Sequence, residues 1–131
     1  MNSPTPGLVP RHIIVADEDR SVVAFIIKTL REDGHAVFHA YDVLAATQLV
    51  YALDPCDLVL SDSKVEGADG VELVVQLRRR RPQVPIIYLA NGRSTPEIER
   101  QLPADVPILR VPFTAEDLRA AVNEVLAGKP T

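Results

Sequence analysis

Short apolar runs, rich in β-branched residues, recur along the chain and alternate with longer segments in which apolar and polar positions mix. Runs of this kind are typical of strands that are buried on both faces of a sheet. The pattern therefore predicts five strands, at residues 13–16, 36–40, 58–61, 86–89 and 106–111.

The segments between these runs have features of helices. Apolar residues at positions 22, 26 and 30 share one helical face, and Gly34 suits the turn after that helix. Asp42 is a good N-cap for the second helix. This second helix is predicted at residues 43–52, and a third at 71–79. A short helix is predicted to begin at Thr95 and to end before Pro103. The last helix is predicted to begin at a capping box at 114–117.

Strict alternation of strands and helices predicts one parallel sheet covered on both faces. We expect an open α/β fold, with a five-stranded sheet in the order 2-1-3-4-5. The first and third strands are then neighbours, and their carboxyl ends meet at the point where the strand order reverses. Residues 63–70 are predicted to be a polar loop that carries Gly67 and Gly70.

Length and composition favour a single globular domain. The 131 residues allow one domain, expected at residues 12–127, with a short C-terminal tail at 128–131. Residues 1–11 are rich in proline and are expected to form a disordered tail, part of which resembles a thrombin cleavage sequence.

Charge and cysteine content narrow the functional classes. The net charge of −4 argues against non-specific binding to nucleic acid or to anionic membranes. No apolar run is long enough to cross a bilayer. The one cysteine, Cys56, fits a reducing, cytoplasmic setting, and we expect it to be a small buried apolar residue.

Three acidic residues follow the two central strands. Asp17 and Glu18 come directly after the first strand, and Asp62 follows the third. The predicted strand order brings these carboxylates together, and such a cluster suits Mg²⁺, which prefers oxygen ligands. A carboxylate in that position can act as a nucleophile towards a phosphoryl group. The alternative is that these acids only cap helices or lie in solvated loops.

Several segments, in this order and spacing, resemble the receiver domain of response regulators. The resemblance covers about residues 11–126. It rests on Ile13-Ile14-Val15-Ala16-Asp17-Glu18-Asp19, Asp57-Leu58-Val59-Leu60-Ser61-Asp62, Glu66-Gly67-Ala68-Asp69-Gly70-Val71-Glu72-Leu73, Pro85-Ile86-Ile87 and Val111-Pro112-Phe113.

The resemblance implies a flavodoxin-like α/β fold with a five-stranded sheet, and a role for each matching residue. Asp62 would be the phosphoacceptor, and Asp17 and Glu18 would be the acidic pair that binds Mg²⁺. The backbone carbonyl of Lys64 would be a further metal ligand. The peptide bond between Val111 and Pro112 would be cis.

The chain departs from the family pattern at the positions that normally sense the phosphoryl group. Ala90 stands where the family has a threonine or serine, and Val111 stands where it has a lysine. Ile108 replaces the family's switching aromatic residue, and Glu66 replaces the usual proline of the loop after the phosphoacceptor. The chain therefore resembles an atypical, stand-alone receiver.

Nearby polar residues are candidates to compensate for these losses. Arg110 could supply a positive charge, although neighbours on a strand point to opposite faces. Asn91, Ser94 and Thr95 lie in the loop after the fourth strand, where each could contact a phosphoryl group or cap the local backbone.

Two functions remain open at this stage. The first is a single-domain response regulator of a two-component phosphorelay. It would accept a phosphoryl group on Asp62, with Mg²⁺, from a histidine kinase or histidine phosphotransfer protein, and would signal to an unidentified downstream protein. The second is a pseudo-receiver that binds proteins independently of phosphorylation. In neither case is the chain expected to be an enzyme beyond self-phosphorylation and autodephosphorylation at Asp62. Dimerisation through the face from the fourth helix to the last helix is a further expectation.

Overall fold

The computed structural model describes residues 10–65 and 68–128. Its main sheet has five parallel strands in the order β2-β1-β3-β6-β7, which confirms the predicted order 2-1-3-4-5. The strands are β1 (His12–Ala16), β2 (Ala36–Ala40), β3 (Leu58–Asp62), β6 (Ile86–Ala90) and β7 (Ile108–Arg110).

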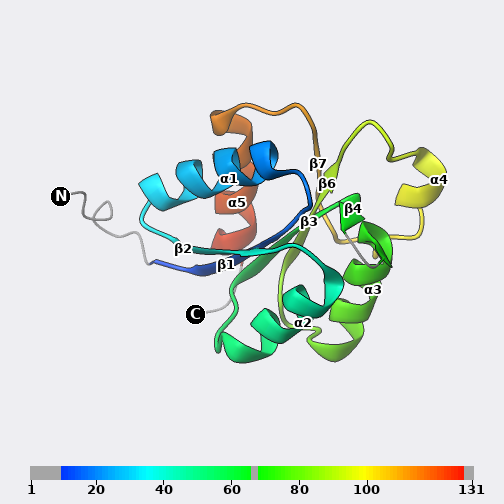
Figure 1. The fold of residues 1–131 in the computed structure, drawn as a ribbon, viewed down its shortest axis with the longest axis horizontal. Helices are drawn as coiled ribbons and strands as arrows, with labels where there is room; N and C mark the ends of the chain where they lie inside the picture. Colours follow the sequence, from blue (N-terminus) through cyan, green and yellow to red (C-terminus); the bar gives the residue numbers. More distant parts are fainter. Residues whose placement is uncertain (1–9, 66–67, 129–131) are drawn as a thin grey trace.

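Helices cover both faces of the sheet (Figure 1). Helices α1 and α5 lie on one face, whereas α2 and α3 lie on the other, and α4 stands beyond the β6–β7 edge. The helices are α1 (Arg20–Glu32), α2 (Val43–Ala52), α3 (Gly70–Arg80), α4 (Pro96–Glu99) and α5 (Ala115–Ala127).

Alternate residues of each strand supply two separate cores. In β1, Ile14 packs in the cluster that holds α2 and α3, whereas Ile13 and Val15 pack with α1 and α5. All three side chains are fully buried. Because each strand is covered on both sides, its sequence reads as a continuous apolar run rather than as an alternating one.

Helix boundaries follow the predicted capping signals. The side chains of Asp19 and Asp42 accept hydrogen bonds from the first backbone N–H groups of α1 and α2. Gly34 has a φ of 90° after the end of α1, a conformation that glycine adopts without steric cost.

Three segments differ from the sequence-based prediction. The predicted loop at 63–70 contains two short antiparallel strands, β4 (Lys64–Val65) and β5 (Ala68–Asp69). Helix α4 has a single turn. Strand β7 starts later than predicted, because Val106 donates its N–H to Pro103 in a turn and Pro107 has no N–H to give to a ladder.

Arg11 directly precedes β1 and contacts residues of the folded domain. Arg11 donates its backbone N–H to Nδ1 of His35 at 3.2 Å, and its carbonyl accepts from Ala36 N at 3.0 Å. Its guanidinium lies 3.7 Å from a carboxylate oxygen of Asp57. Residues 1–9 and 129–131 of the predicted tails, with Glu66 and Gly67, lie outside the described residues.

The capping box that opens α5 is formed as predicted. Thr114 Oγ1 accepts from Asp117 N, and an oxygen of Asp117 accepts from Thr114 N, both at 3.0 Å. Changing Thr114 to alanine should therefore lower the free energy of unfolding by about 1 kcal/mol, measured by urea denaturation. Thr95→Ala, which removes the cap of the one-turn α4, should cost less because α4 has no buried residue. An equal or larger loss at Thr95 would contradict this account.

Candidate functional site

Two carboxylates lie side by side at the carboxyl ends of the central strands. Asp17 directly follows β1, and Asp62 is the last residue of β3. These strands are hydrogen-bonded neighbours, with Ala16 opposite Ser61. Asp17 is 1% exposed and Asp62 is 5% exposed. The chain thus buries two acids at the switch point of the sheet, where an open α/β fold binds its ligands.

Asp17 is held in place from both sides. Its Oδ1 accepts the backbone N–H of Asp19 at 2.8 Å. Its carbonyl oxygen accepts a hydrogen bond at 2.8 Å from Nε2 of His39, which must therefore carry the ring proton. The second carboxylate oxygen, Oδ2, is buried without a hydrogen-bond partner among the described residues.

The pKa of Asp17 is raised to about 7, against an ordinary value of 3.8, chiefly because its carboxyl is buried. The negative charges of Asp62 and Asp19 contribute to this rise, and the hydrogen bond from Asp19 N opposes it. Near neutral pH this carboxyl is therefore poised between its two protonation states, and a cation beside it would favour the ionised form.

The structure does not assemble the third predicted carboxylate into the same cluster. Glu18 is exposed, and within residues 10–65 and 68–128 no group of three acidic, histidine or cysteine side chains is arranged to hold a metal. The reason is its place in the chain, since Glu18 follows Asp17 in the loop that leaves the sheet. The predicted metal roles of Glu18 and of the Lys64 carbonyl stay predictions.

The buried pair fits a hard divalent cation nevertheless. Mg²⁺ is commonly held by only one or two carboxylates and keeps several of its water ligands. An unpartnered buried oxygen on Asp17, next to a second buried acid, is the donor set such an ion requires. Asp17 and Asp62 are the two buried carboxylates that would hold it.

The backbone around Asp62 is fixed by Ser63 and Gly70. The Ser63 carbonyl accepts the N–H of Gly70 at 3.0 Å, and Ser63 donates both its N–H and its hydroxyl to Leu89 O, at 2.9 and 2.7 Å. Gly70 packs directly on the Asp62 carbonyl. Ser63 and His39 were not recognised from the sequence as supports of the site, because neither has a local pattern that reports a long-range hydrogen bond.

One loop candidate reaches the site. The side-chain nitrogen of Asn91 lies 3.4 Å from Oδ2 of Asp62. Ser94 instead hydrogen-bonds the Tyr88 hydroxyl at 3.0 Å and a Glu99 oxygen at 2.8 Å. Thr95 caps α4.

Two of the substituted family positions, Ala90 and Val111, lie next to one another. Val111 donates its N–H to the Ala90 carbonyl at 2.9 Å, and Ala90 is buried. The peptide bond from Val111 to Pro112 is cis, as the resemblance implied. Ile108 is 38% exposed. Neither Ala90 nor Val111 has a side chain that can hydrogen-bond a phosphoryl group.

Arg110 does not replace the missing lysine in this structure. Its guanidinium makes two hydrogen bonds to the carboxylate of Glu99, at 2.6 and 3.2 Å. This contact holds the pKa of Glu99 below its ordinary value. Arg110 is thus engaged with α4 rather than with Asp62.

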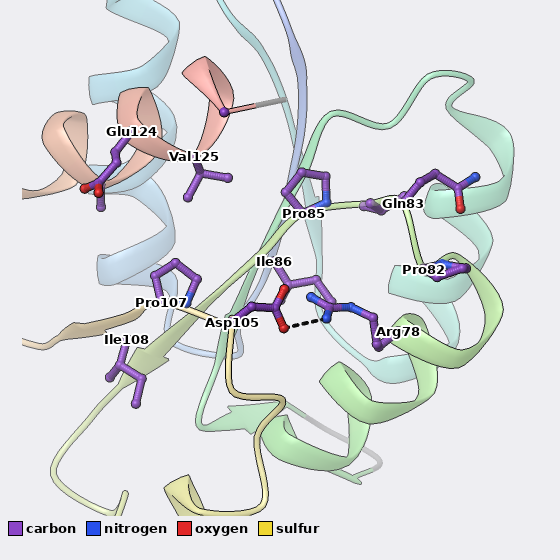
Figure 2. A pocket seen from close by; sticks show the side chains of 13 residues that line it. Arg78, Pro82, Gln83, Pro85, Ile86, Asp105, Pro107, Ile108, Glu124 and Val125 are labelled. Atoms are coloured by element: carbon purple, nitrogen blue, oxygen red, sulfur yellow. Dashed lines mark hydrogen bonds and ion pairs between the residues drawn. The ribbon is translucent and has the colours of Figure 1, made fainter. Parts of the chain in front are cut away.

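A cavity of about 590 Å³ lies at the opposite end of the sheet (Figure 2). It opens at the amino ends of β6 and β7, where Pro85, Ile86 and Pro107 form apolar walls. Arg78 on its rim is paired with Asp105 at 2.8 Å. The charge of Arg78 is neutralised by Asp105, and the walls are largely apolar. This cavity therefore does not share the chemistry of the acidic pair.

The fold and the acidic pair together define a flavodoxin-like α/β domain with a buried carboxylate site. Solved structures share this fold. A putative response regulator from Chloroflexus aurantiacus is 24% identical with a TM-score of 0.81, over 91% of this chain and 99% of that chain. A receiver domain of Francisella response regulator 1452 is 26% identical with a TM-score of 0.76, over 89% and 97%.

A longer protein also contains the fold. NtrX from Brucella abortus is 20% identical with a TM-score of 0.80, and the match covers 92% of this chain but 28% of NtrX. The family model of the response regulator receiver domain matches residues 13–123. The chain therefore belongs to the response regulator receiver domain family of two-component signalling systems. Helices long and apolar enough to span a membrane do not occur in the described part of the chain.

Proposed function

We propose that this receiver domain accepts a phosphoryl group on Asp62. The donor would be a histidine kinase or a histidine phosphotransfer protein, the classes with which receiver domains interact. The observation that carries the proposal is the buried pair of Asp17 and Asp62 at the switch point of a receiver fold. The cation would be Mg²⁺, bound by Asp17, Glu18, Asp62 and the carbonyl of Lys64.

The reaction is a transfer to a carboxylate oxygen. A lone pair of Asp62 attacks phosphorus, and the bond from phosphorus to the donor breaks with its electrons going to the donor. Bound Mg²⁺ supplies positive charge that offsets repulsion between the carboxylate and the phosphate. His39 and Asp19 N fix the position of Asp17, and Ser63 and Gly70 fix the backbone of Asp62. Autodephosphorylation would be attack of water on the same phosphorus. The bond from phosphorus to the Asp62 oxygen would break with its electrons going to the carboxylate, and inorganic phosphate would leave with the protons of the water.

The substitutions at Ala90 and Val111 support a weak conformational response. A hydrogen bond to a charged group is worth about 1.5–3 kcal/mol, and a neutral one about 0.5–1.5 kcal/mol. Losing both donors would remove roughly 2–4 kcal/mol of the free energy by which phosphorylation favours the active conformation. A nearly complete shift from the inactive to the active conformation needs about 5.5 kcal/mol. We therefore infer that phosphorylation changes this domain less than it changes a receiver with both residues.

A second function is favoured by the same substitutions. With Ala90, Val111 and Ile108 in place, the domain could serve as a protein-interaction module whose binding does not depend on phosphorylation. Its contact surface would be the face from α4 to α5, through which it could also form a homodimer. Ile108 lies on this face and is part-exposed.

Intact-mass spectrometry after incubation with phosphoramidate separates the two functions. We expect wild type to gain one phosphoryl group only in the presence of Mg²⁺, and Asp62→Asn to gain none. Asp57→Asn tests a buried acid at the other end of the same strand and should leave the gain intact if the protein folds. A folded wild type that gains nothing, beside a conventional receiver that does, would support the phosphorylation-independent module.

A further inference from the structure

Asn91 is the described loop residue whose side chain reaches the proposed phosphoacceptor. It directly follows Ala90, the position that lacks the family's hydroxyl. Its side-chain nitrogen lies 3.4 Å from Oδ2 of Asp62, which is 5% exposed. A polar group in contact with a buried carboxylate can act on a phosphoryl group attached there.

The orientation of the Asn91 amide is set by its other contacts. Its Oδ1 accepts the backbone N–H of Arg93 at 2.8 Å, so the oxygen is turned into the loop. Its backbone N–H donates to Ser63 Oγ at 2.9 Å, which ties the residue to the end of β3. With the oxygen engaged, the NH₂ group faces Asp62. It is thus a donor fixed before any phosphoryl group arrives.

An NH₂ group has two N–H donors, and the contact with Asp62 uses one of them. The second remains for a phosphoryl oxygen. Ser94 is a different case, because its hydroxyl is engaged by Tyr88 and Glu99, away from Asp62. Within the loop from 91 to 95, the side chain of Asn91 therefore contacts Asp62, whereas those of Ser94 and Thr95 contact other groups.

We propose that the side-chain amide of Asn91 binds the phosphoryl group on Asp62 and takes the place of the hydroxyl that Ala90 lacks. The inference rests on the proposed phosphorylation of Asp62 and specifies how the group is held. In the transition state the negative charge is spread over the three phosphoryl oxygens beside Asp62. A fixed donor that contacts these oxygens stabilises this arrangement more than it stabilises the free carboxylate. Asn91 would then affect the rate of transfer as well as the lifetime of the product.

The test uses phosphoramidate as donor with Mg²⁺. An Asp62 oxygen bonds to phosphorus, and the P–N bond breaks with its electron pair going to nitrogen. The nitrogen leaves as ammonia because phosphoramidate already carries it protonated. The rate constant of phosphoryl gain is measured by intact mass for wild type, Asn91→Ala, Asn91→Asp and Ser94→Ala, with urea denaturation of each.

Asn91→Asp is the sharper variant because it keeps an oxygen for Arg93 N–H, and hence the loop turn, while exchanging the donor for an acceptor. We expect Asn91→Ala to lower the rate constant about tenfold, the effect of one lost charged hydrogen bond. Asn91→Asp should lower it further, and Ser94→Ala should leave it unchanged.

A second readout is independent of rate. When beryllofluoride, a phosphoryl mimic, binds wild type, NMR should show a proton–fluorine nuclear Overhauser effect between the side-chain amide of Asn91 and the mimic, whereas backbone anchoring alone predicts none. If wild type gains a phosphoryl group and Asn91→Ala gains it equally fast, the role of Asn91 is overturned and that of Asp62 stands. If wild type gains none, both proposals fail.

Discussion

Replacing Gly70 with alanine is expected to lower the free energy of unfolding by about 3 kcal/mol or more. An added Cβ would lie 1.7 Å from the carbonyl oxygen of Asp62 and 2.7 Å from its carbonyl carbon. Both atoms belong to the backbone, so they cannot move aside as a flexible side chain would. Either α3 or the end of β3 must shift, and β3 carries the proposed phosphoacceptor. Urea denaturation monitored by circular dichroism measures the loss.

Gly92→Ala is the matched control, because nothing lies within 4 Å of its added Cβ. It should change the free energy of unfolding by less than about 1 kcal/mol. If Gly70→Ala still folds, its phosphorylation should also slow, since a displacement of about 1 Å can cost a hundredfold in rate. Equal stability of the two alanine variants would contradict the close packing of Gly70 on Asp62.

Replacing Asp17 with asparagine is expected to make the protein more stable at pH 8, by about 2–4 kcal/mol. Asparagine keeps an oxygen for the N–H of Asp19 and removes the buried charge. It also presents an N–H where Asp17 has its unpartnered oxygen. Urea denaturation of wild type and variant across pH measures the difference.

The pH dependence follows from the raised pKa of Asp17, about 7 in the folded protein against 3.8 in the unfolded chain. Between these values the unfolded chain has released the proton and the folded protein still holds it. Ionisation therefore favours unfolding as the pH rises through this window, and the penalty is complete above about pH 7. The advantage of Asp17→Asn should be constant above pH 7, shrink below it, and vanish near 3.8.

Two controls test whether the stability gain of Asp17→Asn comes from removing the buried charge of Asp17. Glu97→Gln removes one negative charge at an exposed position and should show no such advantage. Mg²⁺ should stabilise wild type, by roughly 2.7 kcal/mol at a hundred times its Kd, and should stabilise Asp17→Asn far less. A variant that is less stable than wild type at pH 8 without Mg²⁺ would contradict the account of a costly buried carboxylate.

The fold was predictable because its signals are local. Each central strand is buried on both faces and therefore reads as an apolar run, and capping residues such as Asp42 and Thr114 mark helix starts. The short pair β4 and β5 was not predictable, because two-residue strands have no periodicity. The late start of β7 depends on a turn hydrogen bond to Pro103, which the pattern does not encode.

The site was predictable only in part. Strand order placed Asp17 beside Asp62, since adjacent parallel strands end at the same edge. The exposed position of Glu18 depends on the path of the loop after β1. The pairing of Arg110 with Glu99, and the orientation of Asn91, depend on contacts between distant segments. Such contacts are set by tertiary packing rather than by residue type.

The most direct test of the central claim is to locate the phosphoryl group by chemical trapping. Borohydride converts an aspartyl phosphate into homoserine, which peptide mass spectrometry can assign to one residue. After incubation with phosphoramidate and Mg²⁺, we expect homoserine at position 62 and an unmodified Asp17. Homoserine at another aspartate, or none at all in a protein shown to be folded, would contradict the claim that Asp62 is the phosphoacceptor.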